Sequence, residues 1–352
     1  MKKMKALKVI TIIFSVIFIL GGLLFLVRGI GQGINNRTPL NGINESKYIE
    51  INDSKQWISI YGENKDNPVL LYLHGGPASS TSAIDYAFTR KWADVYTVVT
   101  WDQRNTGKSY DSKRKNDLLT KSMFLEDGKQ ITEYLLSYLN KSKITILGHS
   151  WGSIFGANLV LEYPEYYECF IGAGQLVDDR ENEIAFKEEA LKWAEGDNEM
   201  LDKVSRLTPE YPDMDHFALK NEIMTKYGYN MMANGSDYNL LSTVLFNPYY
   251  SLGDWINYLN SDIGSYKEFM LSSEFNSFSL KGRNTYYVPY YNINGNKDYQ
   301  TNYKLAEAYF NDVIAPYKKL FIMNNMTHGL LESDSEGFSK IIHEIREIEK
   351  KR

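Results

Sequence analysis

One five-residue segment restricts the fold of this chain more than any other feature of the sequence. Residues 148–152 read Gly-His-Ser-Trp-Gly, a G-x-S-x-G match centred on Ser150. Residues 143–147 before it form a β-rich run typical of a buried strand, and residues 153–161 after it are typical of a helix. In this setting the two glycines allow a strained strand-to-helix turn that exposes the serine hydroxyl. Ser150 is therefore the candidate nucleophile, and it is expected at the edge of a sheet.

Short β-rich runs alternate with amphipathic helical patterns along most of the remaining chain. This alternation is typical of an α/β fold, in which a mostly parallel sheet has helices on both faces. Helical periodicity is clear in residues 123–139 and again near residues 341–348, where apolar residues recur at helical spacing. We expect about eight strands, at residues 48–51, 57–61, 69–73, 96–101, 144–147, 169–172, 286–293 and 320–323.

One long stretch interrupts the alternation. Residues 176–285 are helical and aromatic in character, with many tyrosines between residues 211 and 258. We interpret this stretch as a helical cap inserted into a core made of residues 46–175 and 286–352. A cap over the strand ends is expected to shape a pocket and to exclude water from it.

The N-terminal region contains an uncharged apolar run. Residues 9–27 are long enough to cross a bilayer as one helix. Four lysines lie within residues 1–8 and only Arg28 follows closely, so the positive-inside rule places residues 1–8 in the cytoplasm and the body outside the cell. A cleaved signal peptide is the alternative, although no A-x-A-like site follows the run. Residues 28–45, rich in Gly and Asn, are expected to form a tether.

The composition excludes several classes of function. A net charge of −5, without an extended basic block beyond the first residues, gives no electrostatic basis for binding nucleic acid. The single cysteine, Cys169, excludes an intramolecular disulfide and leaves no Cys-rich spacing for a zinc site. Its apolar neighbours indicate a buried thiol on a strand.

A serine becomes a good nucleophile only when a neighbouring base takes its proton, so a histidine is required. The chain has five histidines. His74 and His149 lie in glycine-rich loops, His216 falls within the cap, and His343 lies off the apolar side of the last helix. His328 directly follows the last expected strand, where a base reaches a serine at the carboxyl edge of the sheet. We therefore expect His328 to be the base.

The base needs a carboxylate that fixes its tautomer and stabilises the imidazolium. In the fold that a strand-turn-helix serine indicates, the chain order is serine, acid, histidine. Asp298 follows the seventh expected strand and precedes His328 by one helix and one strand, so it is the expected acid. Asp312, near a helix end, and Glu332, after the histidine, are the alternatives.

The oxyanion of the tetrahedral intermediate needs N–H donors. The backbone N–H of Trp151, the residue after the serine, is the first expected donor. The second is expected from residues 74–77, which read His-Gly-Gly-Pro after the third strand. Pro77 has no N–H, so Gly76 is preferred and Gly75 is the alternative.

Three motifs together resemble those of a known family. Residues 74–77 (His-Gly-Gly-Pro), 101–109 (Trp-Asp-Gln-Arg-Asn-Thr-Gly-Lys-Ser) and 148–153 (Gly-His-Ser-Trp-Gly-Ser) resemble the ordered motifs of the prolyl iminopeptidase family of α/β-hydrolases. The resemblance covers residues 48–352 except the cap, and it departs from the family at Ala78 and Asn105, where glycine is usual. It implies an α/β-hydrolase that removes N-terminal residues, typically proline, from peptides without a metal or organic cofactor.

The resemblance also implies cap glutamates that hold the free amine of the substrate. Glu181 and Glu183, just after the sixth expected strand, are candidates, and a solvated acidic start of a helix is the alternative. We expect the protein to transfer the acyl group of a small peptide to water. We also expect its N-terminal helix to have the lipid bilayer as its partner. An esterase or lipase with the same triad, acting on small or lipid esters, is the first alternative, and a non-catalytic surface binding protein is the second.

Overall fold

The computed structural model describes the backbone of residues 2–352 and the side chains from Ile10 onward. Its centre is one sheet with the strand order β1-β2-β4-β3-β5-β6-β7-β8. β1 is antiparallel to β2 and β2 to β4, whereas the other pairs are parallel, so the expected mostly parallel sheet of eight strands is confirmed. The strands are β1 (Ile43–Ile51), β2 (Ser54–Gly62), β3 (Val69–Leu73), β4 (Thr97–Asp102), β5 (Ile144–His149), β6 (Tyr167–Ala173), β7 (Tyr290–Gly295) and β8 (Lys318–Met323).

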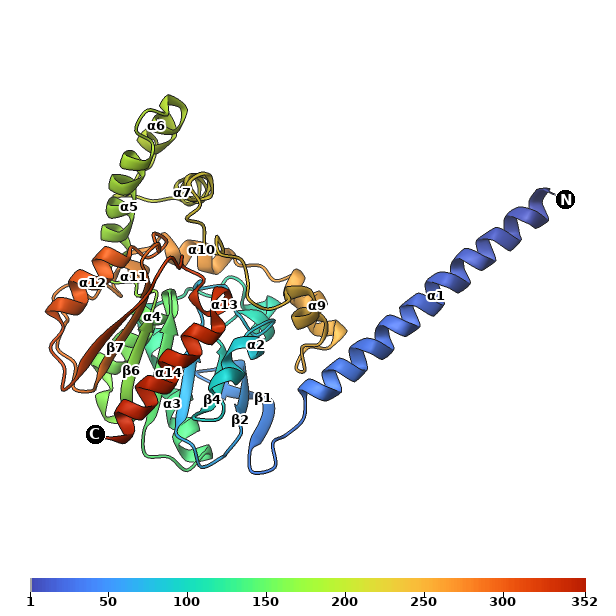
Figure 1. Ribbon diagram of the computed structural model, residues 1–352, viewed down its shortest axis with the longest axis horizontal. Helices are drawn as coiled ribbons and strands as arrows, with labels where there is room; N and C mark the ends of the chain where they lie inside the picture. Colours follow the sequence, from blue (N-terminus) through green and yellow to red (C-terminus); the bar gives the residue numbers. More distant parts are fainter. Residues whose placement is uncertain (1) are drawn as a thin grey trace.

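Helices cover both faces of this sheet (Figure 1). Successive side chains of a strand point to opposite faces. On β3, Leu71 therefore packs in the cluster that includes Phe124 of α3 and Phe155 of α4, whereas Leu70 packs in the cluster that includes Phe338 of α14. The helices of the core are α2 (Tyr86–Thr89), α3 (Lys121–Tyr138), α4 (Trp151–Glu162), α12 (Tyr303–Asp312), α13 (Leu330–Ser333) and α14 (Ser335–Lys350).

A helical insertion joins β6 to β7. It leaves the sheet at the carboxyl end of β6, the same edge at which the parallel strands β5 and β7 end. Figure 1 shows α5, α6 and α7 standing beyond this edge. Its helices are α5 (Asp179–Trp193), α6 (Asn198–Ser205), α7 (Met214–Tyr227), α8 (Leu240–Leu245), α9 (Leu252–Leu259), α10 (Gly264–Met270) and α11 (Ser273–Asn276).

The N-terminal helix α1 (Lys2–Asn35) is longer than the expected span. Its segment Ile10–Asn35 is long and apolar enough to cross a membrane, and it projects away from the body (Figure 1). The expected tether at residues 28–45 is wrong, because α1 continues to Asn35 and β1 already begins at Ile43. Hydrogen bonds from Arg28 and Gln32 to the backbone of the insertion hold this end of α1 against the body.

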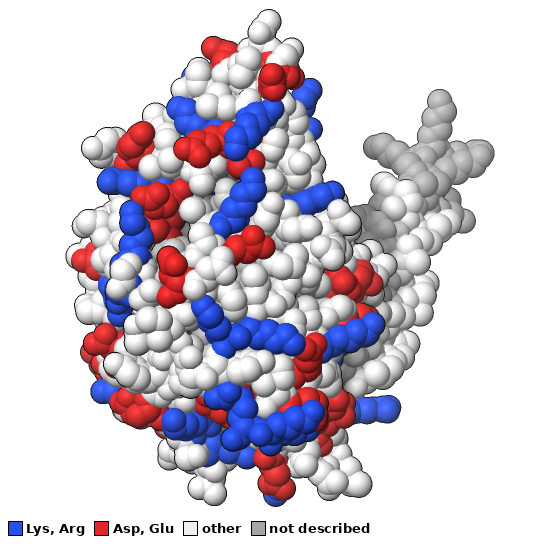
Figure 2. All heavy atoms as spheres, turned by 60° about the vertical axis from the view of Figure 1, so that its left-hand side comes forward, with Lys and Arg blue, Asp and Glu red and all other residues white. Residues whose placement is uncertain are grey.

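Charged side chains of both signs lie close together on one face of the body (Figure 2). Figure 2 shows Lys and Arg next to Asp and Glu on the face that it presents, without a large area of one sign. This face therefore has no field of a single sign that would attract an oppositely charged partner over a long distance.

Candidate active site

Ser150 occupies a strained turn between β5 and α4. Its backbone has φ 58° and ψ −121°, an unfavourable conformation for a residue with a side chain. The glycines on either side leave no room for larger residues. A Cβ on Gly148 would lie 2.0 Å from the carbonyl oxygen of Gly152, and a Cβ on Gly152 would lie 2.1 Å from that of Leu73. The strand-to-helix turn that the G-x-S-x-G segment predicts is therefore present.

His328 and Asp298 meet at the carboxyl edge of the sheet. Nδ1 of His328 lies 2.7 Å from Oδ2 of Asp298, and both side chains are fully buried. The other oxygen of Asp298 accepts hydrogen bonds from the backbone N–H groups of Gln300 and Thr301. The Thr301 hydroxyl donates to Oδ2 at 3.0 Å. The carboxylate is thus fixed by four donors, one of which is the imidazole.

The alternative acids lie elsewhere. Asp312 is exposed at the end of α12, where its backbone carbonyl accepts a hydrogen bond from Asn284. Glu332 is buried on α13, and burial raises the pKa of its carboxyl group. Its Oε2 has no hydrogen-bond partner among the described residues, His328 included. Of the three candidate acids, only Asp298 holds the imidazole.

A second histidine supports the first. The ring of His149 lies 4.8 Å from that of His328, and its Nε2 is 2.9 Å from the backbone carbonyl oxygen of His328. Burial and the neighbouring imidazole lower the pKa of His149 to about 3, so the ring is neutral. A neutral ring that donates from Nε2 fixes the loop carrying His328 without adding a positive charge beside it.

Gln103 connects the three sequence motifs. Its side-chain amide donates to the carbonyl oxygen of His74 at 3.2 Å, and its side-chain oxygen accepts from the indole N–H of Trp151 at 2.9 Å. Its backbone N–H donates to Nε2 of His74, whose Nδ1–H donates in turn to Gly75. Burial lowers the pKa of His74 to about 4, which agrees with this neutral tautomer. Gln103 lies within the second motif, but no pattern in the sequence indicates this connecting role.

The glycine loop of the first motif lies directly against the serine. A Cβ on Gly75 would be 3.1 Å from Cβ of Ser150 and 3.6 Å from its Oγ. Gly76 follows with φ 123°, a conformation that favours glycine. Asn105, where the family usually has glycine, has φ 54°, which asparagine tolerates better than most residues. The departure at Asn105 therefore preserves the backbone of the motif.

The helical insertion is bonded to the loop that carries His328. The backbone N–H of Gly329 donates to the carbonyl oxygen of Met231 at 2.7 Å. The side-chain oxygen of Asn234 accepts from both the N–H and the hydroxyl of Thr327, at 3.1 and 3.0 Å. The residues on both sides of His328 are therefore held by the insertion, and its position depends on how the insertion sits over the core.

The structure gives Glu181 and Glu183 roles other than holding a substrate amine. Glu181 forms a surface ion pair with Lys281 at 2.6 Å. Glu183 is buried, with its carboxylate 2.5 Å from Nζ of Lys220 and 2.8 Å from Nε2 of His216. Burial raises the pKa of Glu183, but these two partners outweigh it and hold the pKa below its ordinary value. Both carboxylates are therefore already paired within the protein, and neither is free to receive an amine in this structure.

Asp179 is a carboxylate that sequence reasoning missed. It lies in the first turn of α5, and its carboxylate makes no hydrogen bond or ion pair with the side chains or backbone that the structure describes. Burial and the nearby Glu183 raise the pKa of Asp179 to about 7. The same cluster contacts the loop of the acid, because Lys220 donates to the carbonyl oxygen of Gln300 at 3.2 Å. No sequence pattern separated Asp179 from the acidic residues around it.

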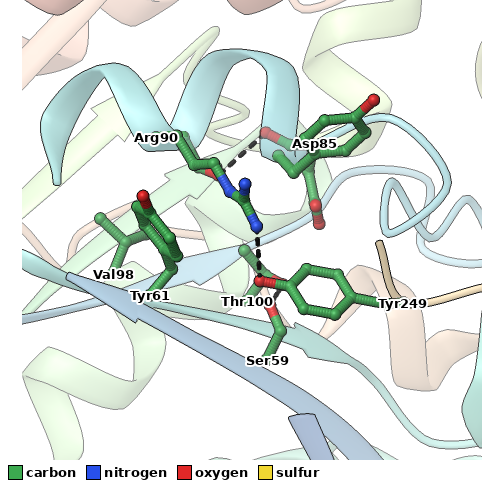
Figure 3. A pocket seen from close by; sticks show the side chains of 9 residues that line it. Ser59, Tyr61, Asp85, Arg90, Val98, Thr100 and Tyr249 are labelled. Carbon is green, nitrogen blue, oxygen red and sulfur yellow. Dashed lines mark hydrogen bonds between the residues drawn. The ribbon is translucent and has the colours of Figure 1, made fainter. Parts of the chain in front are cut away.

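A small cavity lies between β2, β4, α2 and the insertion (Figure 3). Its volume is about 10 Å³, which is room for a single water molecule. Arg90 crosses it, donating to the hydroxyl of Tyr249 at 3.0 Å and stacking over the ring of Tyr61 at 4.1 Å. Burial and Asp102 raise the pKa of Asp85 at its edge well above the ordinary value. The side chains around this cavity form a contact between the core and the insertion.

Among the described residues, no three His, Cys, Asp or Glu side chains come together in a way that holds a metal ion.

The chain is similar to known hydrolases over most of its length. Residues 68–308 match the family described as alpha/beta hydrolase fold. The probable aminopeptidase YbaC of Bacillus subtilis is 27% identical over 293 residues, which are 80% of this chain and 90% of that protein. The proline iminopeptidase of Lactobacillus helveticus is 25% identical over 175 residues, 49% of this chain and 57% of that protein.

Two solved structures have a similar fold. A proline iminopeptidase-related protein from Thermus thermophilus superposes with a TM-score of 0.61 at 18% identity, over 86% of this chain and 96% of that one. A bacterial membrane phospholipase A superposes with the same TM-score at 15% identity, over 98% of this chain and 99% of that one.

Proposed function

Because this chain belongs to the alpha/beta hydrolase fold family, we propose that it is a serine hydrolase with Ser150 as nucleophile, His328 as base and Asp298 as acid. Its relatives make it a prolyl iminopeptidase-like hydrolase. The observation that carries the triad is the 2.7 Å contact between Nδ1 of His328 and Oδ2 of Asp298, at the sheet edge where the strained Ser150 also lies.

In the proposed reaction, Oγ of Ser150 attacks the carbonyl carbon of the substrate while Nε2 of His328 takes the hydroxyl proton. Asp298 holds Nδ1–H and stabilises the imidazolium. The backbone N–H groups of Trp151 and Gly76 stabilise the oxyanion. His328 then protonates the leaving amine or alcohol, and an acyl-enzyme on Ser150 remains. Water, deprotonated by His328, hydrolyses this ester and regenerates the serine.

The preferred substrate is a short peptide with a free N-terminus. The relatives named as aminopeptidase and proline iminopeptidase support this choice. A carboxylate holds the ammonium group of a free N-terminus by a strong, charge-assisted hydrogen bond. We assign this role to Asp179, because its carboxylate is unpaired among the described residues, and because the neighbouring Glu183–Lys220 pair contacts the loop that carries Asp298.

The second candidate is a hydrolase of small or lipid esters that uses the same triad. The apolar helix α1 favours it, because a protein held at a bilayer meets lipid esters at high local concentration. The name of the phospholipase that shares the fold indicates a lipid substrate, but the sequence of that protein is only 15% identical to this chain. In both versions α1 is the anchor, with its N-terminus in the cytoplasm and the hydrolase outside.

A fluorophosphonate probe and a pair of substrates test the proposal. The detergent-solubilised full chain should be labelled by the probe, and Ser150→Ala should lose both labelling and turnover while its thermal stability stays close to wild type. Proline p-nitroanilide should be cleaved faster than p-nitrophenyl butyrate if the chain is an aminopeptidase. The opposite preference supports the ester hydrolase, and labelling that persists in Ser150→Ala removes Ser150 from the mechanism.

A further inference from the structure

Helix α9 has an apolar side that no other described element covers. Leu252, Ile256, Leu259 and Ile263 are 49%, 60%, 80% and 39% exposed. The spacing of four and three residues places Leu252, Ile256 and Leu259 on one side of α9, and Ile263 follows in the segment that leads into α10. We call these four residues the α9 stripe. Isolated exposed leucines are common on protein surfaces, but a continuous stripe marks a surface that contacts something apolar.

Aromatic contacts on an adjacent side of α9 fix its orientation. Trp255 and Tyr258 pack against Tyr250, with the Trp255 and Tyr250 rings 4.5 Å apart. The N-terminus of α9 is capped by Ser251 and Asp254 in a reciprocal pair of hydrogen bonds. Because these contacts hold the helix on the body, the α9 stripe points outward as a feature of the fold.

The end of α1 is bonded to the segment that leads into α9. Arg28 donates to the carbonyl oxygen of Tyr250 at 2.6 Å, and Gln32 donates to the carbonyl oxygens of Asn247 and Tyr250 at 2.7 and 3.0 Å. Asn35 donates to the carbonyl oxygen of Phe246 at 2.9 Å. The position of α1 relative to this part of the insertion is therefore set by side-chain bonds along two turns of the helix.

These bonds place the α9 stripe at a definite level relative to α1. Arg28 is the first charged residue after the uncharged run, so it marks where α1 leaves the hydrocarbon region of a bilayer. Its partner Tyr250 lies two residues before the start of α9 at Leu252. Figure 1 shows α9 beside the base of α1.

We propose that α9 lies in the headgroup region of the phospholipid bilayer that α1 crosses, with the α9 stripe directed at the acyl chains. The inference rests on the proposed membrane location of α1, and it adds a second contact between the body and the lipid. An amphipathic helix at this depth buries its apolar side at the boundary of headgroups and acyl chains. The helical insertion thereby faces the membrane, and the bonds from α1 keep it there.

Fluorescent labels on α9 test the inference in the full chain. An environment-sensitive dye is attached to two variants, Ile256→Cys and Asn257→Cys. Position 256 lies in the stripe, whereas position 257 is also exposed but points about 100° away around the helix. The native Cys169 is buried and does not compete for the label. In vesicles of phosphatidylethanolamine and phosphatidylglycerol, the label at position 256 should shift its emission to the blue and be quenched by lipids with brominated acyl chains. The label at position 257 should respond less.

Glu347→Cys on α14, at the end of the molecule remote from α1 in Figure 1, gives the aqueous reference. If the chain floats with the vesicles and position 256 matches this reference, α1 is an anchor but α9 does not contact lipid. A blue shift without quenching by the brominated lipids assigns the stripe to a protein contact and overturns the inference. A chain that does not float with vesicles overturns both the anchor and the α9 contact.

Discussion

Oδ2 of Asp298 lies 2.7 Å from Nδ1 of His328 although thirty residues separate them in the chain. Asp298 follows β7 and His328 follows β8, and these two strands are parallel neighbours in the sheet. The carboxyl ends of parallel neighbours meet at one edge, so the two loops are brought together by the register of the strands. The contact is a consequence of topology, and a conservative substitution tests the proposed role of Asp298 as the acid.

Asp298→Asn should lower turnover by about 10⁴-fold, because an amide favours the wrong tautomer of His328 and cannot stabilise the imidazolium. The variant keeps the volume of the side chain, so its thermal stability separates a catalytic loss from unfolding. The measurement is kcat on the better substrate of the pair described above. Asp312→Asn, at an exposed helix end, is the matched control and should retain nearly wild-type turnover. A large loss in Asp312→Asn or Glu332→Gln, with Asp298→Asn active, would reassign the acid.

The positions of the strands could be predicted from the sequence because a strand buried on both faces reads as an apolar run. All eight expected strands overlap an observed one, and β3 has the expected bounds at Val69–Leu73. The largest errors are at the ends, where β1 begins at Ile43 and β7 at Tyr290. At these places the residues that decide the boundary belong to partner strands, which a local pattern does not contain.

The fixed junction after α1 and the pairing of the cap carboxylates could not be predicted in the same way. Gly and Asn near residues 29–44 are typical of a flexible linker, and only long-range hydrogen bonds to residues 246–250 order the end of α1. Lys220 pairs with Glu183 across 37 residues of the chain. Which charged residues pair at this separation depends on how α5 and α7 pack. The sequence alone therefore did not indicate that the carboxylate of Glu183 has a partner.

Protease protection tests the topology of α1. If α1 crosses the membrane with its N-terminus in the cytoplasm, protease added to intact cells should digest the body, and untreated full-length protein should fractionate with membranes. The reason is the lysine excess before the apolar run, which retains the N-terminal side in the cytoplasm. A shorter protein released into the medium indicates cleavage after the apolar run, and complete protection in intact but not lysed cells indicates the reverse orientation.

Glu183→Gln should lower the free energy of unfolding by about 3 kcal/mol or more at neutral pH, because it leaves the buried ammonium of Lys220 without a counter-charge. The pKa of Glu183 is held below its ordinary value of 4.5 in the folded protein. Its stabilising contribution is therefore complete above that value and is lost as the pH falls through the lower folded pKa. Urea unfolding at several pH values should show the gap between wild type and variant narrowing in acid.

Glu181, which lies on α5 like Glu183 but forms an ion pair on the surface, supplies the control for that experiment. Glu181→Gln breaks an ion pair with Lys281 in which both side chains are largely solvated, so stability should change by less than about 1 kcal/mol. Equal losses in the two variants, or a loss in Glu183→Gln that does not depend on pH, would contradict the buried charge cluster.

Asp179→Asn tests the proposed site for the substrate amine. Removing one charged partner of an ammonium group costs about 1.5 to 3 kcal/mol, so kcat/KM for proline p-nitroanilide should fall by about tenfold to a hundredfold. The loss should appear mainly in KM, and p-nitrophenyl butyrate, which has no amine, should be hydrolysed at the wild-type rate.

The pKa of Asp179 is raised to about 7 by burial and by Glu183, with Lys220 acting in the opposite direction. Only the ionised carboxylate pairs with the protonated amine, so the ratio of wild-type to variant kcat/KM should rise as the pH increases through about 7 and fall again above about 8, where the amine of the substrate loses its proton. Equal losses on the two substrates, or a ratio that stays constant with pH, would show that Asp179 supports the fold of α5 and does not bind the amine.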